Sequence, residues 1–323
     1  MNRLLAASIL IASSASAQVQ LSGLRSGYVV DEATRVLRPI VGLPGSAYLG
    51  RAIPLPFPTA SAIAVAGGGS LVIISAGDEP EAWLVRKLDE LEPEAIRLAN
   101  ADRVFAGIRA NTALLHSARE GTVRLISTLD KAPSIGPEVR EASLGGKPVA
   151  GAIDEESGCA YLAVRQEETS IVSLCPDRAG EPRVVRQLGP VDVTAMVYWK
   201  RNGLLFAERK ANRVSILRAP AAAGAPSIVA SEADGLADPA AMQPVPGSRI
   251  AIVQGDPARL MVADPARKEA PIFADLPVAA ELLDYLAPDR ILSVNRVNAS
   301  PLVVLDAEQE FASYFIPPSG EPE

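Results

Sequence analysis

The stretch CAYLAVRQEETSIVSLC (residues 159–175) decides the fold of this chain. Two short runs rich in aliphatic and β-branched residues flank a polar turn centred on Glu167, which is the pattern of a β-hairpin. The same element, a strand, a turn of charged or small residues and a second strand, recurs along the sequence. Further copies lie at residues 70–85, 113–125, 203–217, 249–262 and 290–304.

The copies are spaced like the units of a repeat protein. Equivalent positions in the second strand of each hairpin follow one another at intervals of 40, 48, 43, 46 and 42 residues, with a mean of about 44. Four short strands and their turns need about this length, which is one blade of a β-propeller. Weaker apolar segments before and after each hairpin would supply the other two strands. The equivalent positions are Trp83, Val123, Ile171, Val214, Leu260 and Leu302.

The sequence therefore predicts an all-β protein, a β-propeller of four-stranded antiparallel blades. Residues 28–31 and 36–40 are interpreted as the last two strands of an additional blade, which makes seven blades. This hairpin lacks obvious inner partners unless residues 47–53 supply one, so six blades is the alternative. A pair of β-sandwiches or an irregular solenoid also stays open. Residues 311–316 are expected to form the fourth strand of the last blade.

One unit resembles a known family of repeats. The segments GLADPAAMQ (residues 235–243), PGSRIAIV (246–253) and NRVSIL (212–217) resemble the repeats of bacterial extracellular β-propellers of the YVTN and NHL type. The likeness covers one repeat well and the others loosely, and the usual Pro-Asp-Gly turn is absent. The resemblance implies the propeller fold. It implies little about function, because such propellers serve as binding modules, scaffolds and enzymes.

The N-terminus has the pattern of a cleavable signal peptide. A short positive region ending at Arg3 precedes an apolar run, and small residues up to Ala17 provide the cleavage site. We therefore expect a signal peptide at residues 1–17, one β-propeller domain at residues 18–317 and a disordered tail at residues 318–323. No later stretch is apolar for long enough to span a membrane. The predicted location is the periplasm or the medium outside the cell.

Composition excludes several kinds of site. One His and two Cys among 323 residues cannot form a three-His zinc site, an HExxH helix or a four-thiolate metal site. The net charge of −7 disfavours nucleic acid as a partner.

The two cysteines are predicted to form a disulfide. Cys159 and Cys175 lie at equal distances from Glu167, so the hairpin register places them directly opposite each other. An exported protein meets oxidising conditions. A shift of one residue would put the two side chains on opposite faces of the sheet. The bridge would staple one blade and carry no redox chemistry, because there is no CxxC motif.

No catalytic or metal-binding residue can be assigned. His116 lies in a strand, and its neighbour Ser117 points to the opposite face, so the two are not a base and nucleophile pair. The acidic clusters are interpreted as solvated turn carboxylates. Asn295 and Asn298 are the one hint of the metal sites that propeller lactonases build from Glu, Asn and Asp. The acidic clusters are Asp78, Glu79 and Glu81; Asp154, Glu155 and Glu156; and Glu167 with Glu168.

These observations favour an exported, non-catalytic binding or scaffold protein with an unknown ligand. The partner would be a protein, a peptide or a glycan of the cell envelope. No cofactor is expected. The alternative is a metal-dependent propeller hydrolase of the lactonase type, and only this alternative implies a cation such as Ca²⁺.

Overall fold

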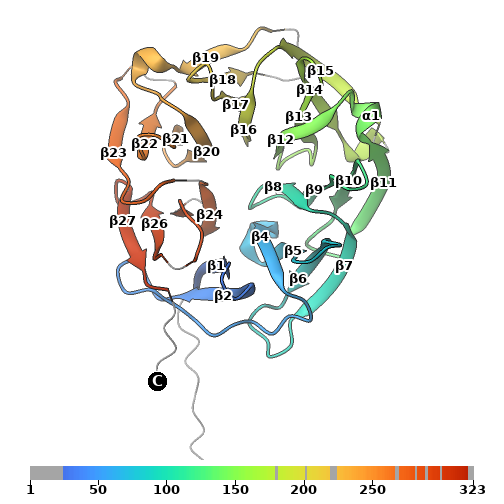
Figure 1. The fold of residues 1–323 in the computed structure, drawn as a ribbon, viewed down its shortest axis with the longest axis vertical. Coiled ribbons are helices and arrows are strands. Elements are labelled where there is room, and N and C mark those ends of the chain that lie inside the picture. Colours follow the sequence, from blue (N-terminus) through green and yellow to red (C-terminus); the bar gives the residue numbers. More distant parts are fainter. Residues whose placement is uncertain are drawn as a thin grey trace, which may run out of the picture.

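The protein forms a closed ring of β-sheets around a central channel (Figure 1). The computed structural model describes residues 25–178, 181–200, 202–218, 224–265, 269–280, 282–287, 290–298 and 300–318. The predicted signal peptide and the first residues of the mature chain lie outside them. Within the described residues, no helix is long and apolar enough to cross a membrane.

The ring has seven blades, which confirms the seven-bladed propeller. Six blades are four-stranded antiparallel sheets, and blade 1 has three strands. Blade 1 comprises β1 (Arg25–Asp31), β2 (Val36–Val41) and β3 (Tyr48–Leu49); blade 2 comprises β4 (Thr59–Val65), β5 (Ser70–Ser75), β6 (Glu81–Arg86) and β7 (Glu94–Asn100); blade 3 comprises β8 (Arg103–Ala106), β9 (Thr112–Ser117), β10 (Thr122–Ser127) and β11 (Ser134–Arg140).

The remaining blades follow in chain order. Blade 4 comprises β12 (Lys147–Ile153), β13 (Ala160–Arg165), β14 (Thr169–Leu174) and β15 (Arg183–Gly189); blade 5 comprises β16 (Val193–Trp199), β17 (Gly203–Glu208), β18 (Arg213–Leu217) and β19 (Ser227–Ala230); blade 6 comprises β20 (Pro239–Val245), β21 (Arg249–Gln254), β22 (Arg259–Ala263) and β23 (Ile272–Asp275); blade 7 comprises β24 (Asp284–Ala287), β25 (Ile291–Ser293), β26 (Leu302–Asp306) and β27 (Ala312–Ile316).

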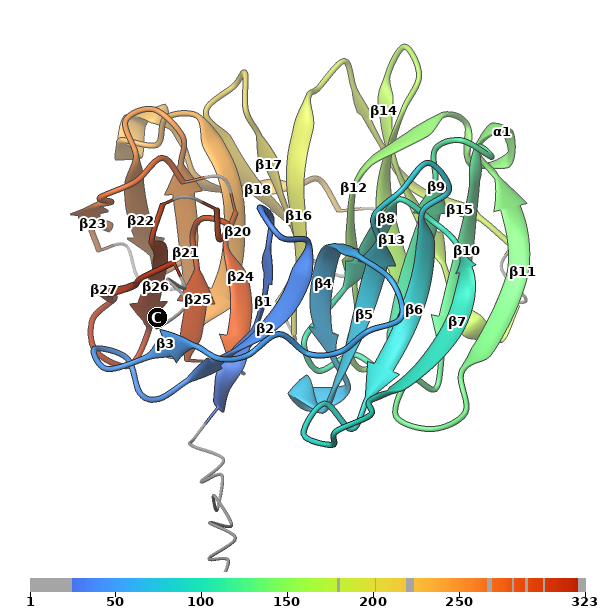
Figure 2. The same cartoon turned by 60° about the horizontal axis from the view of Figure 1, so that its bottom comes forward.

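The recurring hairpin is the pair of second and third strands in blades 2 to 7. The short helix α1 (Glu141–Leu144) lies between blades 3 and 4. We call the face that carries the turns between second and third strands the upper face, and the opposite face the lower face; Figure 2 shows the upper face at the top. The expected fourth strand of the last blade is confirmed as β27, which pairs with β26.

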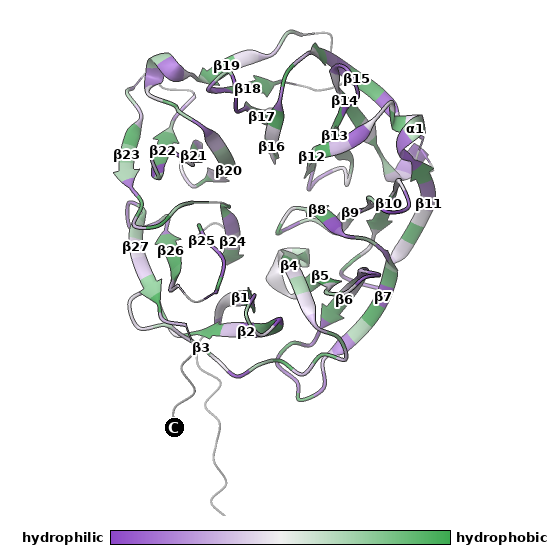
Figure 3. Ribbon diagram, in the orientation of Figure 1, coloured by the Kyte–Doolittle hydropathy of each residue, from purple (hydrophilic) through white to green (hydrophobic). Residues whose placement is uncertain are grey.

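The cores lie between blades. In β5, Val72 and Ile74 pack against blade 3, whereas Leu71 and Ile73 pack in a cluster with Leu37 of blade 1. Both faces of the sheet are therefore covered, and hydrophobic residues recur along the middle strands (Figure 3). This explains why the strands show little polar alternation in the sequence.

Blade 1 differs from the prediction. Residues 28–31 and 36–40 lie in its first two strands, not its last two, and residues 47–53 supply the outer strand β3, not an inner partner. The direction of β1 explains the ambiguity. Arg25, at its start, contacts Leu88 and Asp89 between third and fourth strands on the lower face, whereas its last residue, Asp31, bridges to an upper-face turn of blade 7. Because β1 runs towards the upper face, it matches the direction of second strands.

The ring closes between blades 1 and 7 without a shared four-stranded sheet among the described residues. The backbone N–H of Glu32 donates to the carbonyl of Val297 over 2.9 Å, and Arg296 forms an ion pair with Glu32 over 2.9 Å. An apolar cluster made by residues of both blades lies beneath these contacts. Gly27 lies against Leu286 in the same seam, where a Cβ atom would come within 2.6 Å of the Leu286 carbonyl oxygen.

We predict that Gly27→Ala destabilises the protein. Its φ of +145° is strained for any other residue, and the new methyl group would push blades 1 and 7 apart. The expected loss in free energy of unfolding is about 2 kcal/mol, which lowers the melting temperature by several degrees. Gly69→Ala is the control, because Gly69 has φ of −78° and its nearest neighbour for a Cβ is 3.7 Å away. Equal melting temperatures for the two variants would contradict the prediction.

Candidate functional site

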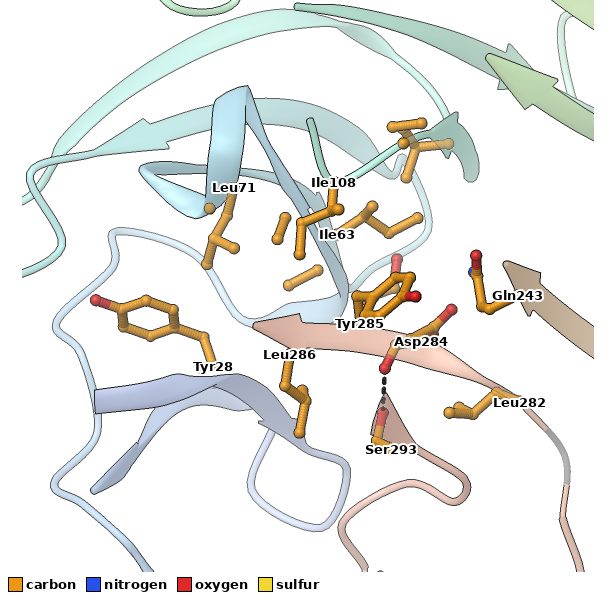
Figure 4. Close-up of a pocket in the computed structure, with 18 of the residues that line it drawn as sticks. Tyr28, Ile63, Leu71, Ile108, Gln243, Leu282, Asp284, Tyr285, Leu286 and Ser293 are labelled. Atoms are coloured by element: carbon orange, nitrogen blue, oxygen red, sulfur yellow. Dashed lines mark hydrogen bonds between the residues drawn. The ribbon is translucent and has the colours of Figure 1, made fainter. Parts of the chain in front are cut away.

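The central channel forms a cavity of about 1190 Å³. The first strands of all seven blades line it, together with residues at both mouths. Its walls combine apolar and polar side chains: Leu71, Ile108 and Leu286 lie around the cavity in Figure 4, and so does Gln243. A cavity of this size and character is what proteins use to hold a ligand of low molecular weight or a short peptide.

Asp284 is one of the carboxylates that line the channel. It is the first residue of β24, and its side chain is exposed. Ser293 donates a hydrogen bond to the backbone carbonyl of Asp284 over 3.4 Å (Figure 4). The carboxylate itself makes no hydrogen bond with the residues that the structure describes. The protein that surrounds Asp284 disfavours its charged form and raises its pKa, and the positive charge of Arg296 offsets this only in part.

The carboxylates that are buried at the ends of strands have partners, unlike the exposed Asp284. Glu208 accepts two hydrogen bonds from Arg213, at 2.8 and 2.6 Å, and Asp306 accepts from Arg290 at 3.2 Å. Burial would raise the pKa of Asp31, but hydrogen bonds from Thr34, Arg38 and Ala33 together lower it. Asp284 therefore differs from these structural carboxylates in having no donor beside it.

Tyr285 closes the wall next to Asp284. Its hydroxyl donates to the backbone carbonyl of Pro244 in the neighbouring blade 6. Burial raises its pKa, so the phenol stays protonated as this bond requires. Tyr285 thus fixes β24 against β20, and this holds the carboxylate of Asp284 in place because adjacent residues of a strand share one backbone.

Charged residues surround the lower mouth of the channel. The backbone N–H of Arg109 donates to the Glu155 carboxylate over 3.0 Å, and Lys200 forms an ion pair with Glu156 over 2.8 Å. Tyr198 stacks on Tyr161 with ring centroids 5.6 Å apart. Burial, followed by the charge of Asp154, raises the pKa of Tyr198 to about 12. The lower mouth of the channel is therefore polar.

The structure places His116 away from the channel. It lies in β9 with 3% of its surface exposed, on the face that packs towards blade 4. Its Nε2 atom is 2.7 Å from Oε1 of Glu141, and its Nδ1 atom is 3.9 Å from Oδ1 of Asp102. The hydroxyl of Ser117 accepts a hydrogen bond from the backbone of Glu120 instead. His116 and Ser117 are not brought together.

The acidic clusters and the two asparagines do not converge. Glu79 and Glu81 form ion pairs with arginines at the surface. The side-chain amide of Asn295 donates to the carbonyl of Pro301 over 2.9 Å and accepts from the backbone N–H of Val303 over 2.7 Å. Both its donor and its acceptor therefore stabilise the local turn. Asn298 accepts from the backbone of a neighbouring turn residue. In the part of the chain that the structure describes, no three His, Cys, Asp or Glu side chains gather as metal ligands would.

Cys159 and Cys175 lie opposite each other on the lower face. The register of β13 and β14 pairs Ala160 with Leu174, and its continuation pairs the cysteines, as the hairpin predicted. The structure joins them in a disulfide, with their Cα atoms 4.2 Å apart. The pair lies at the end of blade 4 and not in the channel.

Comparisons with known proteins agree on the fold. No family model matches the sequence, and no curated protein matches it. A solved structure of a streptogramin B lyase has a TM-score of 0.61 and 10% identity, over 83% of this chain and 87% of that one. Selenomethionine-substituted virginiamycin B lyase from Staphylococcus aureus has a TM-score of 0.58 and 11% identity, over 88% and 92%. A chain of a nidogen/laminin complex gives a TM-score of 0.48 at 15% identity, over 74% and 89%.

At these identities the likeness shows the β-propeller fold and nothing finer. Asp284 was missed in the sequence. The available signal was an acidic residue at the start of the first strand of blade 7, shortly after Leu282 and Leu283. Without the strand boundaries, Asp284 resembles the many acidic residues of the turns.

We predict that Asp284→Asn makes the unliganded protein more stable at neutral pH. The raised pKa means that the folded chain keeps a proton where the unfolded chain, with an ordinary value of 3.8, has released it. The stability of the wild type therefore falls as pH rises from that value through the raised pKa. The asparagine variant lacks this loss, so it should melt about 1–3 °C higher at pH 7.5. The gain should shrink as the pH approaches 4.

The control for this titration is Asp78→Asn, because Asp78 lies exposed in a turn. Thermal melts of the three proteins at a series of pH values provide the measurement. A constant difference between wild type and Asp284→Asn at every pH would contradict the assignment.

The disulfide leads to a second prediction. Intact mass measured without reductant should be about 2 Da below the value for two thiols, because a bridge removes two hydrogens. Cys159→Ser combined with Cys175→Ser should lower the free energy of unfolding by up to about 3 kcal/mol, because the bridge closes a loop of 16 residues. Two free thiols in the exported protein would refute the bridge.

Proposed function

We propose that this chain is an exported, non-catalytic binding propeller whose ligand enters the central channel and presents a cationic group to Asp284. The observation that carries the proposal is the Asp284 carboxylate, which lines the channel, lacks a hydrogen-bond donor among the described residues and has apolar side chains such as Leu282 and Leu286 near it. An ammonium group would supply the missing charge and donors. The walls would contact the apolar part of the ligand.

Export is supported by the N-terminal signal pattern and by the cysteine pair. The sequence of residues 1–17 fits a cleavable signal peptide, and the opposed cysteines suit an oxidising compartment. The similarity to YVTN and NHL repeats favours a bacterial cell envelope. We therefore propose the periplasm or the exterior of the cell as the location, with an envelope partner.

Catalysis is less well supported than binding. A virginiamycin B lyase with a histidine replaced by alanine, solved with quinupristin, is described as catalytically inactive. The single histidine of the present chain, His116, is buried and does not line the channel. The lactonase alternative needs asparagine and acidic ligands around the channel, but Asn295 is engaged by backbone groups at both ends of its amide.

Protonated hexylamine tests the proposal, because it combines an ammonium group with an apolar chain of suitable length. Calorimetry should detect its binding to the wild type at pH 8, and Asp284→Asn should weaken it by about tenfold or more, since a charge-assisted hydrogen bond is lost. Binding should also weaken as the pH falls through the raised pKa of Asp284, because only the charged carboxylate attracts the ammonium group.

Two controls make the result specific. Asp78→Asn should bind hexylamine like the wild type, because Asp78 lies outside the channel. Hexanol, which has the same chain and no charge, should bind the wild type and Asp284→Asn equally. If hexylamine does not bind, or binds Asp284→Asn as tightly as the wild type, the proposal fails.

A further inference from the structure

The channel is wider beside blade 1 than elsewhere. Around most of the ring, only first strands and loop residues line the cavity. In the two blades that flank blade 1, the cavity also reaches second strands, at Leu71 of β5 and Ser293 of β25. A recess therefore lies between β24 and β4, with β1 at its back, and we call it the blade 1 slot.

The direction of β1 accounts for the slot. In blades 2 to 7 the first strand runs from the upper to the lower face, and the second strand returns. β1 is the innermost strand of blade 1. It runs from the lower to the upper face, which is the direction of the second strands in the other blades. Among the described residues, β2 is the one strand that pairs with β1, and the isolated bridge from Asp31 to Val297 covers its upper end.

The edge of β1 that faces the slot carries free backbone groups. Gly50 donates to the carbonyl of Pro39 over 2.8 Å, and Ile53 donates to that of Leu37 over 2.8 Å, so both carbonyls point away from β1. Pro39 and Leu37 stand opposite Tyr28 and Val30 in the β1–β2 register. In an antiparallel pair such positions exchange no hydrogen bonds. The N–H and C=O groups of Tyr28 and the N–H of Val30 therefore point into the slot, while the carbonyl of Val30 lies at the bridge to Val297.

The two walls of the slot differ in character. On the side of blade 2, Ala62, Ala64 and Leu71 form a small apolar surface that belongs to the same cluster as Tyr28 and Val30. On the side of blade 7, Leu286 lies against Gly27, and Asp284 is two residues earlier on the same face of β24. An added strand would thus meet apolar groups on one face, and a carboxylate followed by an apolar group on the other.

We propose that an extended peptide segment of a partner protein binds in the slot as an additional strand, antiparallel to β1. Its backbone pairs with the N–H and C=O groups of Tyr28 and with the N–H of Val30, and its side chains alternate between the two walls. The segment carries a basic residue between two apolar ones, so that the cation meets Asp284 while its neighbours contact Ala62, Ala64 and Leu71. A further apolar residue follows and meets Leu286. This inference rests on the proposed function, because it names the occupant of the same channel.

The probe is the peptide acetyl-Val-Lys-Val-Leu-Thr-amide. Calorimetry should show that the purified mature protein binds it. A methyl group on the backbone nitrogen of the second valine removes the N–H that faces the carbonyl of Tyr28, and this should weaken binding by about tenfold or more. A methyl group on the lysine backbone nitrogen, which faces the open channel, should change the affinity by less than about threefold. Replacing the lysine of the peptide by glutamate should abolish binding.

A variant of the protein separates this inference from the proposed function. Ala64→Leu fills the apolar wall of the slot, so it should weaken the peptide about tenfold or more while hexylamine still binds at Asp284 on the opposite wall. Hexylamine binding with no response of the peptide to N-methylation would overturn strand addition and leave the channel site standing. Peptide binding only after removal of residues 18–24 would also overturn the inference, because the slot would then belong to the chain's own N-terminal segment.

Discussion

Each sheet has two apolar faces that must be covered, and the rest of the structure follows from this requirement. Leu71 and Ile73 of β5 lie on one side of blade 2, and Val72 and Ile74 lie on the other. No single sheet can bury both sets by itself, so each blade depends on both neighbours, and the array is satisfied only as a ring. The ring is closed at one seam, between blades 1 and 7. Between blades 1 and 7 the described chain provides an apolar cluster, one short bridge and the close approach of Gly27 to Leu286.

This manner of closure also shapes the channel. Blade 1 contributes three strands, and β1 enters from the lower face, so its direction is opposite to that of the other first strands. The cavity widens there until it reaches Leu71 and Ser293. The irregularity of the ring and the most accessible part of its channel are therefore one feature. In a ring of seven complete blades, the backbone N–H and C=O groups of Tyr28 would already be paired.

Much of the fold can be predicted from sequence, because hairpins are local. Strands of β-branched residues with a polar turn fix their own register, so the spacing of Cys159 and Cys175 about Glu167 is enough to place them opposite each other. Six copies of such a unit and the additional hairpin at residues 28–40 indicate the architecture. The place of the hairpin at residues 28–40 could not be predicted, because its direction is set by contacts with Leu88 and Val297, which are distant in sequence. Asp284 was missed for the same reason: its isolation depends on how seven separate segments surround it.

The isolation of Asp284 is itself the strongest indication of function. Asp31, Glu208 and Asp306 show what this chain does with a buried carboxylate that serves the fold: each has an arginine and, for Asp31, backbone donors. Asp284 accepts no hydrogen bond from the described residues, and the positive charge of Arg296 offsets only part of the effect that raises its pKa. A group that weakens the fold and faces an accessible apolar cavity is best explained by what it binds, because an uncharged side chain of the same shape would serve the structure better.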